Sequence, residues 1–359
     1  MTAPRIVIGA GGTAGHVVPA LAVADALRAE GAEVAFVGGD RAEVELVPAA
    51  GYELHRVRVA PLERGHPVKA LRAGLIAAGA ARQARAVLAR ARPVAVLGAG
   101  GYVAGPVGVS AVVSRVPLVL MEADSHLGLT NRWLAPFARR VCLAFPIEGR
   151  DGPRYRLTGR PVPAPATDWR AARERFGIGL RESCVLVFGG SQGARSINYA
   201  AVEAFAGARF RVLHAAGERD LPDLKNLRPP GMSGSHYDLR GYISRFGEAL
   251  LACDLVVARA GGSIFEIAAH GKPAVLIPYP HATADHQTAN ARYMERAGAA
   301  VVIPDDELTP ARLAGEVGRL LADRGRLAAM ARASAALARP HAARDIAHEL
   351  LAAARHRPQ

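Results

Sequence analysis

The sequence predicts an α/β protein of two domains, each built around a parallel sheet. Three observations predict this class. The chain has 359 residues, more than one hydrophobic core usually takes. Short apolar runs alternate with longer helical patterns in both halves, and several of these runs end in glycine-rich turns. Because such alternation gives parallel strands with right-handed crossovers, we expect two domains that face each other across a cleft lined by their glycine turns.

The composition is that of a globular protein with a large core. Half of the residues are hydrophobic, and the mean hydropathy is +0.12. The N-terminal sequence MTAPRIVIGAGG passes straight into a strand pattern, so we predict no signal peptide. Arg115 and Pro117 interrupt the most apolar long stretch, residues 104–121, so we expect no spanning helix. The cysteines are odd in number and far apart, which favours a reducing compartment over disulfide bonds or a metal cluster.

The charge leaves three classes of partner open. A formal net charge of +13 is compatible with nucleic acid, an anionic membrane surface or an anionic substrate, although an arginine- and alanine-rich composition competes with all three explanations. The sequence has no basic patch interleaved with aromatic residues and no zinc-finger spacing, so we predict no nucleic-acid partner. Residues 67–92 are an arginine-rich helical stretch with little acid, which predicts either a solvent-facing helix or a surface that binds anionic lipid.

The first half begins with a strand, a glycine turn and a helix. Arg5–Gly9 is the strand, and the run GAGGTA that follows fits the dinucleotide fingerprint G-x-G-x-x-A. The acidic residue expected after the second strand, Val34–Val37, is replaced by Gly38 and Gly39, which weakens that interpretation. His16 lies at the helix entrance, where it either faces a ligand or serves as a solvated or capping side chain.

Two further strands of this half also end at candidate functional residues. Pro93–Leu97 leads into a second glycine turn and Tyr102. Leu118–Met121 leads into Glu122 and Asp124, which are candidate acid/base groups or caps of the next helix. Residues 146–168 are rich in proline, glycine and charge and are predicted to link the domains. We therefore assign residues 1–160 to the first domain and 161–359 to the second, and the closing helices are free to pack back on the first.

The second half repeats the plan, and Asp168 is predicted to cap its first helix. Its predicted strands are Cys184–Phe188, Phe210–Leu213, Tyr237–Gly241, Leu255–Val257, Ala274–Ile277 and Val301–Ile303. The closing helices are predicted at Pro310–Leu321, Arg324–Ala338 and Ala342–Ala354. Residues 189–195 and 259–263 form glycine turns that suit phosphate. Glu266, early in the helix after the second turn, either accepts hydrogen bonds from a ribose diol or only complements the helix dipole.

Six motifs occur in one order between about residues 5 and 305: GGTAGHVVPALAVA, GAGGYVAGPVG, GLTNRWLAPFA, GGSQGARSIN, RAGG followed by Glu266, and DHQTANA. In these motifs the chain resembles the MurG family of glycosyltransferases. The resemblance implies a GT-B fold, in which two Rossmann-like parallel-sheet domains face a central cleft. It also implies transfer of N-acetylglucosamine from UDP-N-acetylglucosamine to undecaprenyl-pyrophosphoryl-N-acetylmuramoyl-pentapeptide (lipid I), which gives lipid II for peptidoglycan. We accordingly expect a peripheral protein on the cytoplasmic face of the cell membrane.

Carried over position by position, the resemblance implies a donor site held mainly by the C-terminal domain. The family's contacts to UDP-N-acetylglucosamine fall on Thr13, Ala14, Gly15, Ser191, Gln192, Ile243, Arg259, Ala260, Gly261, Gly262, Ser263, Glu266, Gln287 and Asn290. Within that set, Glu266 corresponds to the ribose carboxylate, Ile243 to a backbone contact with uracil, and Gln287 to a sugar contact. Positions tied to activity in the family fall on His16, Tyr102, Glu122 and Asn198.

The sequence departs from the family pattern in three places. The family's H-E-Q-N segment is here residues 121–124, so its histidine is Met121 and its donor-contacting asparagine is Asp124. The arginine of G-N-P-V-R is Pro163 here, and Arg160 is the candidate replacement. The segment from Arg259 to Glu266 is one residue shorter than usual. These departures keep two alternatives open, a related glycosyltransferase with another acceptor and a non-catalytic nucleotide-sugar-binding protein; a nicotinamide-dependent oxidoreductase is a third.

The expected chemistry is an inverting displacement without metal or cofactor. Glycine-turn N–H groups and helix N-termini would stabilise the charge that develops on the leaving UDP. We find no convincing Asp-x-Asp motif, which a metal-dependent transferase would use instead. A base near the N-terminal turns would take the proton from the acceptor hydroxyl, and His16 is the first choice, with Glu122 or Asp124 second.

Overall fold

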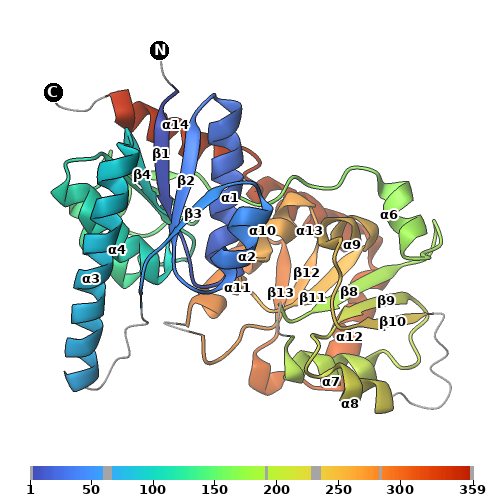
Figure 1. The fold of residues 1–359 in the computed structure, drawn as a ribbon. Helices are drawn as coiled ribbons and strands as arrows, with labels where there is room; N and C mark the ends of the chain where they lie inside the picture. Colours follow the sequence, from blue (N-terminus) through green and yellow to red (C-terminus); the bar gives the residue numbers. More distant parts are fainter. Residues whose placement is uncertain (1–2, 60–66, 191–192, 228–235, 283–284, 356–359) are drawn as a thin grey trace. The chain divides into compact units, whose positions relative to one another are not determined.

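The computed structural model describes residues 3–59, 67–190, 193–227, 236–282 and 285–355 (Figure 1). The chain forms two compact units. The first contains Met1–Val162 and Arg339–Gln359, and the second contains Pro163–Ala338. Among the described residues, no helix is both long enough and apolar enough to cross a membrane.

The first unit is built on a seven-stranded parallel sheet of order β3-β2-β1-β4-β5-β6-β7. Its strands are β1 (Arg5–Gly9), β2 (Glu33–Gly38), β3 (Glu53–Arg56), β4 (Ala95–Gly98), β5 (Leu118–Glu122), β6 (Arg140–Leu143) and β7 (Tyr155–Leu157). Its helices are α1 (Ala14–Ala29), α2 (Ala42–Ala49), α3 (Pro67–Ala91), α4 (Gly101–Val113), α5 (Leu129–Leu134), the 3-10 turn η1 (Ala135–Phe137) and α14 (Ala342–Arg355).

Both faces of this sheet are buried, as the apolar strand sequences require. Alternate side chains of a strand point to opposite faces. Ile6 and Ile8 therefore join a core cluster with apolar residues of α1 and α14, whereas Val7 joins a second cluster with residues of α3 and α4. A parallel sheet with helices on both faces places every βα turn at the same edge, where the candidate residues of this half lie.

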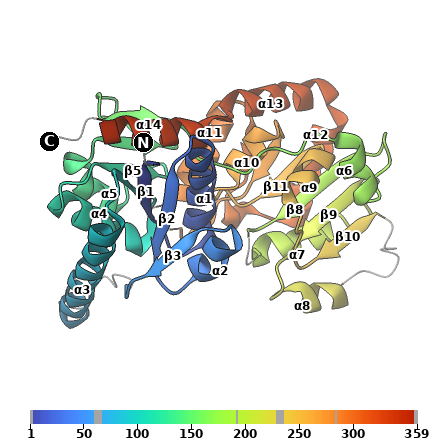
Figure 2. The same cartoon turned by 45° about the horizontal axis from the view of Figure 1, so that its top comes forward.

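The last helix, α14, belongs to the first unit although it ends the chain. It contacts α1 and strands β4, β5 and β6, and Figure 2 shows it in red beside the blue elements of this unit. Ile346, Ala347 and Leu350 are fully buried in the cluster that α1 also forms. The sequence division at residue 160 assigned this segment to the second domain, while allowing the closing helices to pack on the first. In the structure, residues 339–359 belong to the first unit, and the buried side chains of α14 pack on α1 and on the first sheet.

The predicted linker at residues 146–168 is wrong over most of its length. Strand β7 lies inside it, and the first unit continues to Val162. Only residues 163–168 precede α6, the first helix of the second unit. The three-residue edge strand pairs with β6 alone, so it needs no apolar run that the sequence would reveal.

The second unit is built on a six-stranded parallel sheet of order β10-β9-β8-β11-β12-β13. Its strands are β8 (Cys184–Phe188), β9 (Arg211–Ala215), β10 (Tyr237–Arg240), β11 (Leu255–Ala258), β12 (Ala274–Leu276) and β13 (Ala300–Val302). Its helices are α6 (Trp169–Arg175), α7 (Arg195–Ala204), α8 (Leu221–Asn226), α9 (Phe246–Ala252), α10 (Ile264–Ala269), α11 (His286–Arg296), the 3-10 turn η3 (Asp305–Glu307), α12 (Pro310–Ala322) and α13 (Arg324–Leu337).

One face of the second sheet packs against α7 and α12. Val185, Val187 and Val257 of the central strands meet Ile197 of α7 and Val317 of α12 in one buried cluster. The carboxylate of Asp168 accepts a hydrogen bond from the Ala171 N–H at 2.9 Å, so the predicted cap of the first helix is confirmed. As in the first unit, the parallel strands bring the glycine turns of this half to one sheet edge.

Candidate functional site

The first glycine turn joins β1 to α1 and carries three predicted donor contacts. Thr13 has extended backbone and is the N-cap of α1, and Thr13, Ala14 and Gly15 are all exposed. The Gly15 carbonyl accepts a hydrogen bond from Arg160 Nη2 at 2.6 Å. The structure therefore brings Arg160, the predicted substitute for the family's arginine, to this turn.

His16 lies in the first turn of α1, partly covered by the second glycine turn. A Cβ on Gly100 would lie only 2.8 Å from His16 Nδ1. That nitrogen is buried and has no hydrogen-bond partner among the described residues. Burial lowers the pKa of His16 and the Arg160 guanidinium lowers it further, while the Asp124 carboxylate opposes both effects. The imidazole is therefore held in its neutral form.

The second glycine turn, between β4 and α4, rests directly on the first. Gly101 has a φ of +72°, and a Cβ there would lie 2.0 Å from the Gly11 carbonyl oxygen. Only glycine permits that backbone conformation and that approach together. Tyr102 follows and is 44% exposed, with the Arg41 guanidinium 5.9 Å from its ring centroid. The two turns thus form one surface that carries His16 and Tyr102.

Glu122, at the end of β5, is occupied by hydrogen bonds within its own loop. Its oxygens accept from the Gly128 N–H at 2.8 Å, the Asn131 Nδ2 at 2.9 Å and the Asp124 N–H at 3.1 Å. Burial raises the pKa of Glu122, although these hydrogen bonds oppose the shift. This geometry holds the loop that carries Asp124, whose own side chain is partly buried. Glu122 is therefore placed better to position the loop than to abstract a proton.

In the second unit, the first glycine turn is set by a buried polar network. Ser191 and Gln192, the predicted diphosphate contacts, lie outside the described residues. Gly193 has a φ of +75°, and a Cβ there would lie 1.9 Å from the Ala216 carbonyl oxygen. The fully buried Asn198 donates from Nδ2 to that same carbonyl at 2.8 Å and to Asp220 Oδ2 at 3.0 Å.

His214 completes this network. Its Nε2 lies 3.1 Å from Asn198 Oδ1 and its Nδ1 lies 2.7 Å from the Tyr237 hydroxyl. Because the Asn198 amide nitrogen is already donating, the imidazole must donate from Nε2 and accept at Nδ1. Burial lowers the pKa of His214 to about 3, so the ring is neutral. This network ties α7 to the ends of β9 and β10 and fixes the backbone on which Gly193 rests.

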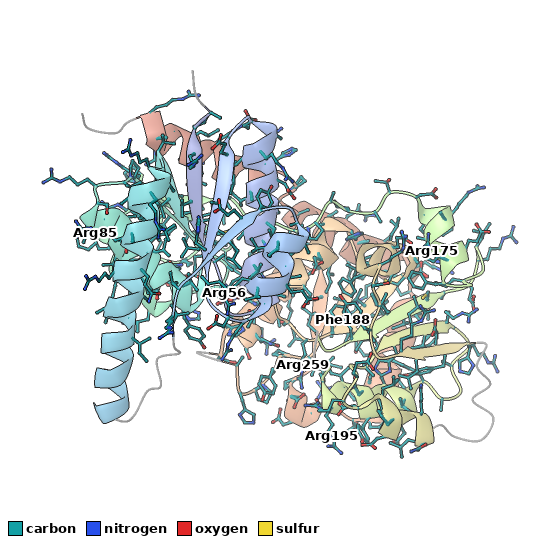
Figure 3. The ribbon with its side chains drawn as sticks, viewed as in Figure 1. Arg56, Arg85, Arg175, Phe188, Arg195 and Arg259 are labelled. Carbon is teal, nitrogen blue, oxygen red and sulfur yellow. The ribbon has the colours of Figure 1, made fainter. Side chains whose placement is uncertain are left out.

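Arg259, which directly follows β11, is buried, and its guanidinium is paired within the protein. Its guanidinium pairs with Asp305 at 2.6 Å, donates to Ser196 Oγ at 2.8 Å, and donates to the Pro278 carbonyl at 3.0 Å. It also lies 5.3 Å from the centroid of the Tyr279 ring. Figure 3 labels Arg259 among these elements. The side chain thereby links the turn after β11 to α7 and to η3.

The turn after β11 positions the remaining predicted contacts. Ala260 is fully buried, Gly261, Gly262 and Ser263 are partly exposed, and Ser263 is the N-cap of α10. Glu266 lies in the first turn of α10 and is partly exposed. Ile243, in the loop after β10, has a side chain that is 3% exposed, which is compatible with the predicted contact through its backbone.

The two amides of α11 face the same loop region but differ in exposure. Gln287 is partly exposed, and its Oε1 accepts from the Tyr279 N–H at 3.0 Å. Asn290 is 2% exposed and donates from Nδ2 to the Ala260 carbonyl at 3.0 Å. Asn290 therefore holds the glycine turn, and Gln287 remains the better placed of the two for a ligand.

Models of two protein domains match the two halves of the chain. The glycosyltransferase family 28 N-terminal domain matches residues 6–143, and the C-terminal domain of the same family matches residues 184–350. A curated relative from Bordetella pertussis is 41% identical over 325 residues, which is 89% of this chain and 90% of the relative. Another, from Halothermothrix orenii, is 36% identical over 334 residues, with coverage of 88% and 90%.

The chain belongs to glycosyltransferase family 28. Both relatives are named UDP-N-acetylglucosamine–N-acetylmuramyl-(pentapeptide) pyrophosphoryl-undecaprenol N-acetylglucosamine transferase. Among solved structures, MurG of Acinetobacter baumannii superposes with a TM-score of 0.79 at 27% identity and covers 97% of this chain and 99% of that one. The predicted α/β class, GT-B fold, resemblance to the MurG family and glycosyltransferase class are thus confirmed. The oxidoreductase alternative is wrong for a family 28 chain.

Several residues that shape this family 28 site have no signal in the sequence. They are Glu43 beneath the first glycine turn, Ser196 and Asp305 beside Arg259, and His214, Asp220 and Tyr237 around Asn198. Each acts through a partner that is distant in the chain. Of these, only Ser196 falls inside a quoted motif, GGSQGARSIN, where it gave no indication of its contact with Arg259.

Proposed function

We propose that this chain transfers N-acetylglucosamine from UDP-N-acetylglucosamine to undecaprenyl-pyrophosphoryl-N-acetylmuramoyl-pentapeptide, with inversion at the anomeric carbon. The observation that carries the substrates is the likeness to relatives named for this reaction over about nine tenths of the chain. Two alternatives differ in outcome. A related transferase would use another acceptor, and a binding protein would hold the donor without turnover.

The donor is assigned mainly to residues of the second unit, and Thr13, Ala14 and Gly15 of the first unit keep their predicted donor contacts. Glu266 accepts hydrogen bonds from the ribose hydroxyls, and Ile243 receives uracil at its backbone. The N–H groups of the glycine turns after β8 and β11 face the diphosphate and offset the charge that develops as UDP leaves. Arg259 supports this arrangement by holding its turn, since its guanidinium is already paired with Asp305.

The proton transfer is assigned to His16 of the first unit. A neutral imidazole accepts the proton of the acceptor hydroxyl while the oxygen attacks the anomeric carbon and the bond to UDP breaks. Tyr102 and Asp124 lie near the same turns and are assigned to substrate positioning. Glu122 holds the loop of Asp124 through its three hydrogen bonds.

The lipid acceptor is assigned to the face of the first unit formed by α3, α4 and α5. Exposed apolar side chains gather there: Val109 and Val113 on α4, Trp133 on α5 and Phe137 on η1. A pocket of about 330 Å³ opens beside them, lined mainly by apolar residues of the three helices. Helix α3, one of these three helices, also carries exposed arginines, including Arg85 (Figure 3). An apolar patch bordered by cations suits an anionic membrane surface.

The test is a transfer assay with labelled UDP-N-acetylglucosamine and two acceptors, lipid I and undecaprenyl phosphate. A reaction in buffer without acceptor is the control. We expect label in lipid II with the first acceptor only. Product with another lipid would identify a different transferase. UDP-N-acetylglucosamine binding by calorimetry without any product would identify a binding protein, and either result would overturn the proposal.

A further inference from the structure

A buried carboxylate lies beneath the first glycine turn and takes no part in the proposed reaction. Glu43, on α2, is 1% exposed. Its Oε2 accepts a hydrogen bond from the Gly12 N–H at 2.9 Å, and its Oε1 accepts from the Gly39 N–H at 2.7 Å. These amides belong to the turns that follow the neighbouring strands β1 and β2. One carboxylate therefore joins two turns at the edge of the sheet where the candidate residues of this unit lie.

The backbone around Glu43 is shaped to admit it. A Cβ on Gly11 would lie 2.8 Å from Glu43 Oε1, and a Cβ on Gly38 would lie 2.7 Å from Glu43 Cγ. A Cβ on Gly39 would lie 3.0 Å from Oε1. The pair Gly38-Gly39, which stands where a dinucleotide-binding chain has its ribose carboxylate, leaves space for Glu43 and for the neighbouring side chains Leu54 and Val59.

The carboxylate occupies a position that an anionic ligand has in related turns. In dinucleotide-binding proteins, the N–H groups of the glycine turn after the first strand point at a pyrophosphate. Here the Gly12 N–H already donates to Glu43. A phosphate at that amide would meet a like charge at short range. In this turn, the Glu43 carboxylate therefore takes the place that a bound phosphate has in dinucleotide-binding proteins.

We propose that Glu43 is a positioning residue that holds the first glycine turn in its working shape without a bound anion. Gly11 supports Gly101 through its carbonyl, and Gly100 in turn covers the His16 imidazole. The carboxylate is therefore connected through backbone contacts to the proposed base. This inference rests on the proposed function, because it assigns to Glu43 the orientation of His16 toward the acceptor hydroxyl.

The test compares Glu43→Gln with Glu45→Gln, a matched control at an exposed position of the same helix. The amide of Gln keeps one acceptor oxygen but sets an NH₂ donor against the other glycine N–H, so one charge-assisted bond is lost. We expect kcat of Glu43→Gln to fall at least about tenfold. The donor KM and the UDP dissociation constant, which depend mainly on the second unit, should stay within about twofold. Glu45→Gln should match the wild type in all three.

A second measurement keeps the proposal testable if Glu43→Gln does not fold. Hydrogen exchange of glycine-labelled wild-type enzyme, without ligand, should show slow exchange at the Gly12 and Gly39 amides. Fast exchange at both would overturn the proposal, as would a folded Glu43→Gln with wild-type kcat or with equal losses in kcat and UDP affinity. Wild-type enzyme that makes no lipid II would refute the proposed function instead, and the exchange rates would still decide whether Glu43 holds the turn.

Discussion

The environment of His16 distinguishes between two roles that its position alone leaves open. A histidine that binds phosphate gains from being protonated, whereas a general base must be neutral. His16 Nδ1 is buried without a partner among the described residues, and Arg160 lies close enough to disfavour a second positive charge. Both features favour the neutral ring, so this residue is better suited to accept a proton.

We predict that His16→Ala lowers kcat by at least about a hundredfold, the usual scale of general base catalysis. UDP affinity measured by calorimetry should change little, because the donor contacts lie mainly on the second unit. Steady-state kinetics with lipid I provide the measurement, in which the kcat of His16→Ala is compared with the kcat of Glu122→Gln. A His16→Ala enzyme with near-normal kcat and weakened UDP binding would reassign this residue to phosphate.

The same argument fixes a pH dependence. Since the pKa of His16 is lowered from 6.5, the base remains unprotonated at and somewhat below neutral pH. The acid limb of log kcat/KM should therefore have its midpoint below that value, with loss of activity as pH falls through it. An acid limb centred above 6.5 would contradict the assignment.

Glu266 tests the donor site. Hydrogen bonds to a charged group are worth roughly 1.5–3 kcal/mol, so Glu266→Ala should weaken UDP binding about ten- to hundredfold. Glu203→Ala, at an exposed position of α7, is the control and should leave the affinity unchanged. Calorimetry with UDP decides this prediction, and a folded Glu266→Ala with wild-type affinity would remove Glu266 from the site.

His214 predicts how stability depends on pH. Its pKa is about 3 in the folded protein against 6.5 for an exposed imidazole. Below the higher value, the unfolded chain binds a proton that the native state does not. The free energy of unfolding should therefore fall by about 1.4 kcal/mol for each pH unit between 6.5 and about 3, and this loss is absent above 6.5.

His214→Gln isolates that contribution, since glutamine keeps an amide near Asn198 but does not titrate. Urea unfolding of both proteins at about pH 7 and about pH 5 should show a smaller loss of stability in the variant. Parallel losses in the two proteins would show that His214 is protonated in the folded state.

At the scale of single residues, sequence reasoning located candidate residues near strand ends and missed several buried side chains that support them. His16, Asn198 and Glu266 lie in motifs at strand ends, where parallel sheets place their sites. Glu43 lies on α2 and His214 on the buried strand β9, outside the glycine turns, and their roles arise from contacts with Gly12 and Asn198, which are distant in the sequence. Such support can be read only from the assembled fold. The motifs predicted which residues belong to the candidate site, and the packing contacts indicate which of them support a turn.

At the scale of elements, the sequence predicted the six strands of the second sheet but missed three strands of the first. Strands β1 and β8 have the predicted bounds, because a central parallel strand is apolar on both faces. Strands β3, β6 and β7 were missed. β3 and β7 are edge strands of three or four residues with polar or half-exposed side chains, and β6 begins with Arg140. Their pairing is decided by the neighbouring strand rather than by a local apolar pattern.

Helix α3 carries the prediction for the membrane. Its buried side chains, Ala84 and Leu88 among them, pack on the core, which leaves Arg82 and Arg85 exposed. Arg82→Glu/Arg85→Glu should weaken binding to anionic vesicles, since each cation near the surface contributes roughly 1 kcal/mol. Sedimentation with anionic and neutral vesicles at low and high salt is the measurement.

The control is an equal charge change on the second unit, Arg324→Glu/Arg332→Glu, at exposed positions of α13. We expect wild type and control to bind anionic vesicles in a salt-sensitive way and the α3 variant to bind less. Equal binding by all three proteins, or no preference for anionic lipid, would exclude this helix as the membrane contact.

At the scale of the whole molecule, the chain order and the units do not coincide. The chain leaves the first unit after Val162 and returns to it at Arg339. Sequence patterns located the closing helices, and Pro340 lies just before the last of them. They could not show which sheet α14 covers, because its apolar face would suit either one. The first unit is therefore complete only when the last twenty or so residues have been made.

The last prediction follows from that arrangement. Ile346 and Leu350 are fully buried against α1 and the first sheet, so Ile346→Ala or Leu350→Ala should cost about 2–5 kcal/mol in the stability of the first unit. Arg344→Ala, on the exposed side of the same helix, should cost little. UDP affinity should be nearly unchanged in all three, because most of the donor residues lie in the second unit. Denaturant unfolding with and without UDP measures both effects, since a ligand stabilises the unit that binds it. If Leu350→Ala lost UDP affinity in step with stability, the two units would unfold as one, and the separate roles assigned to them would have to be abandoned.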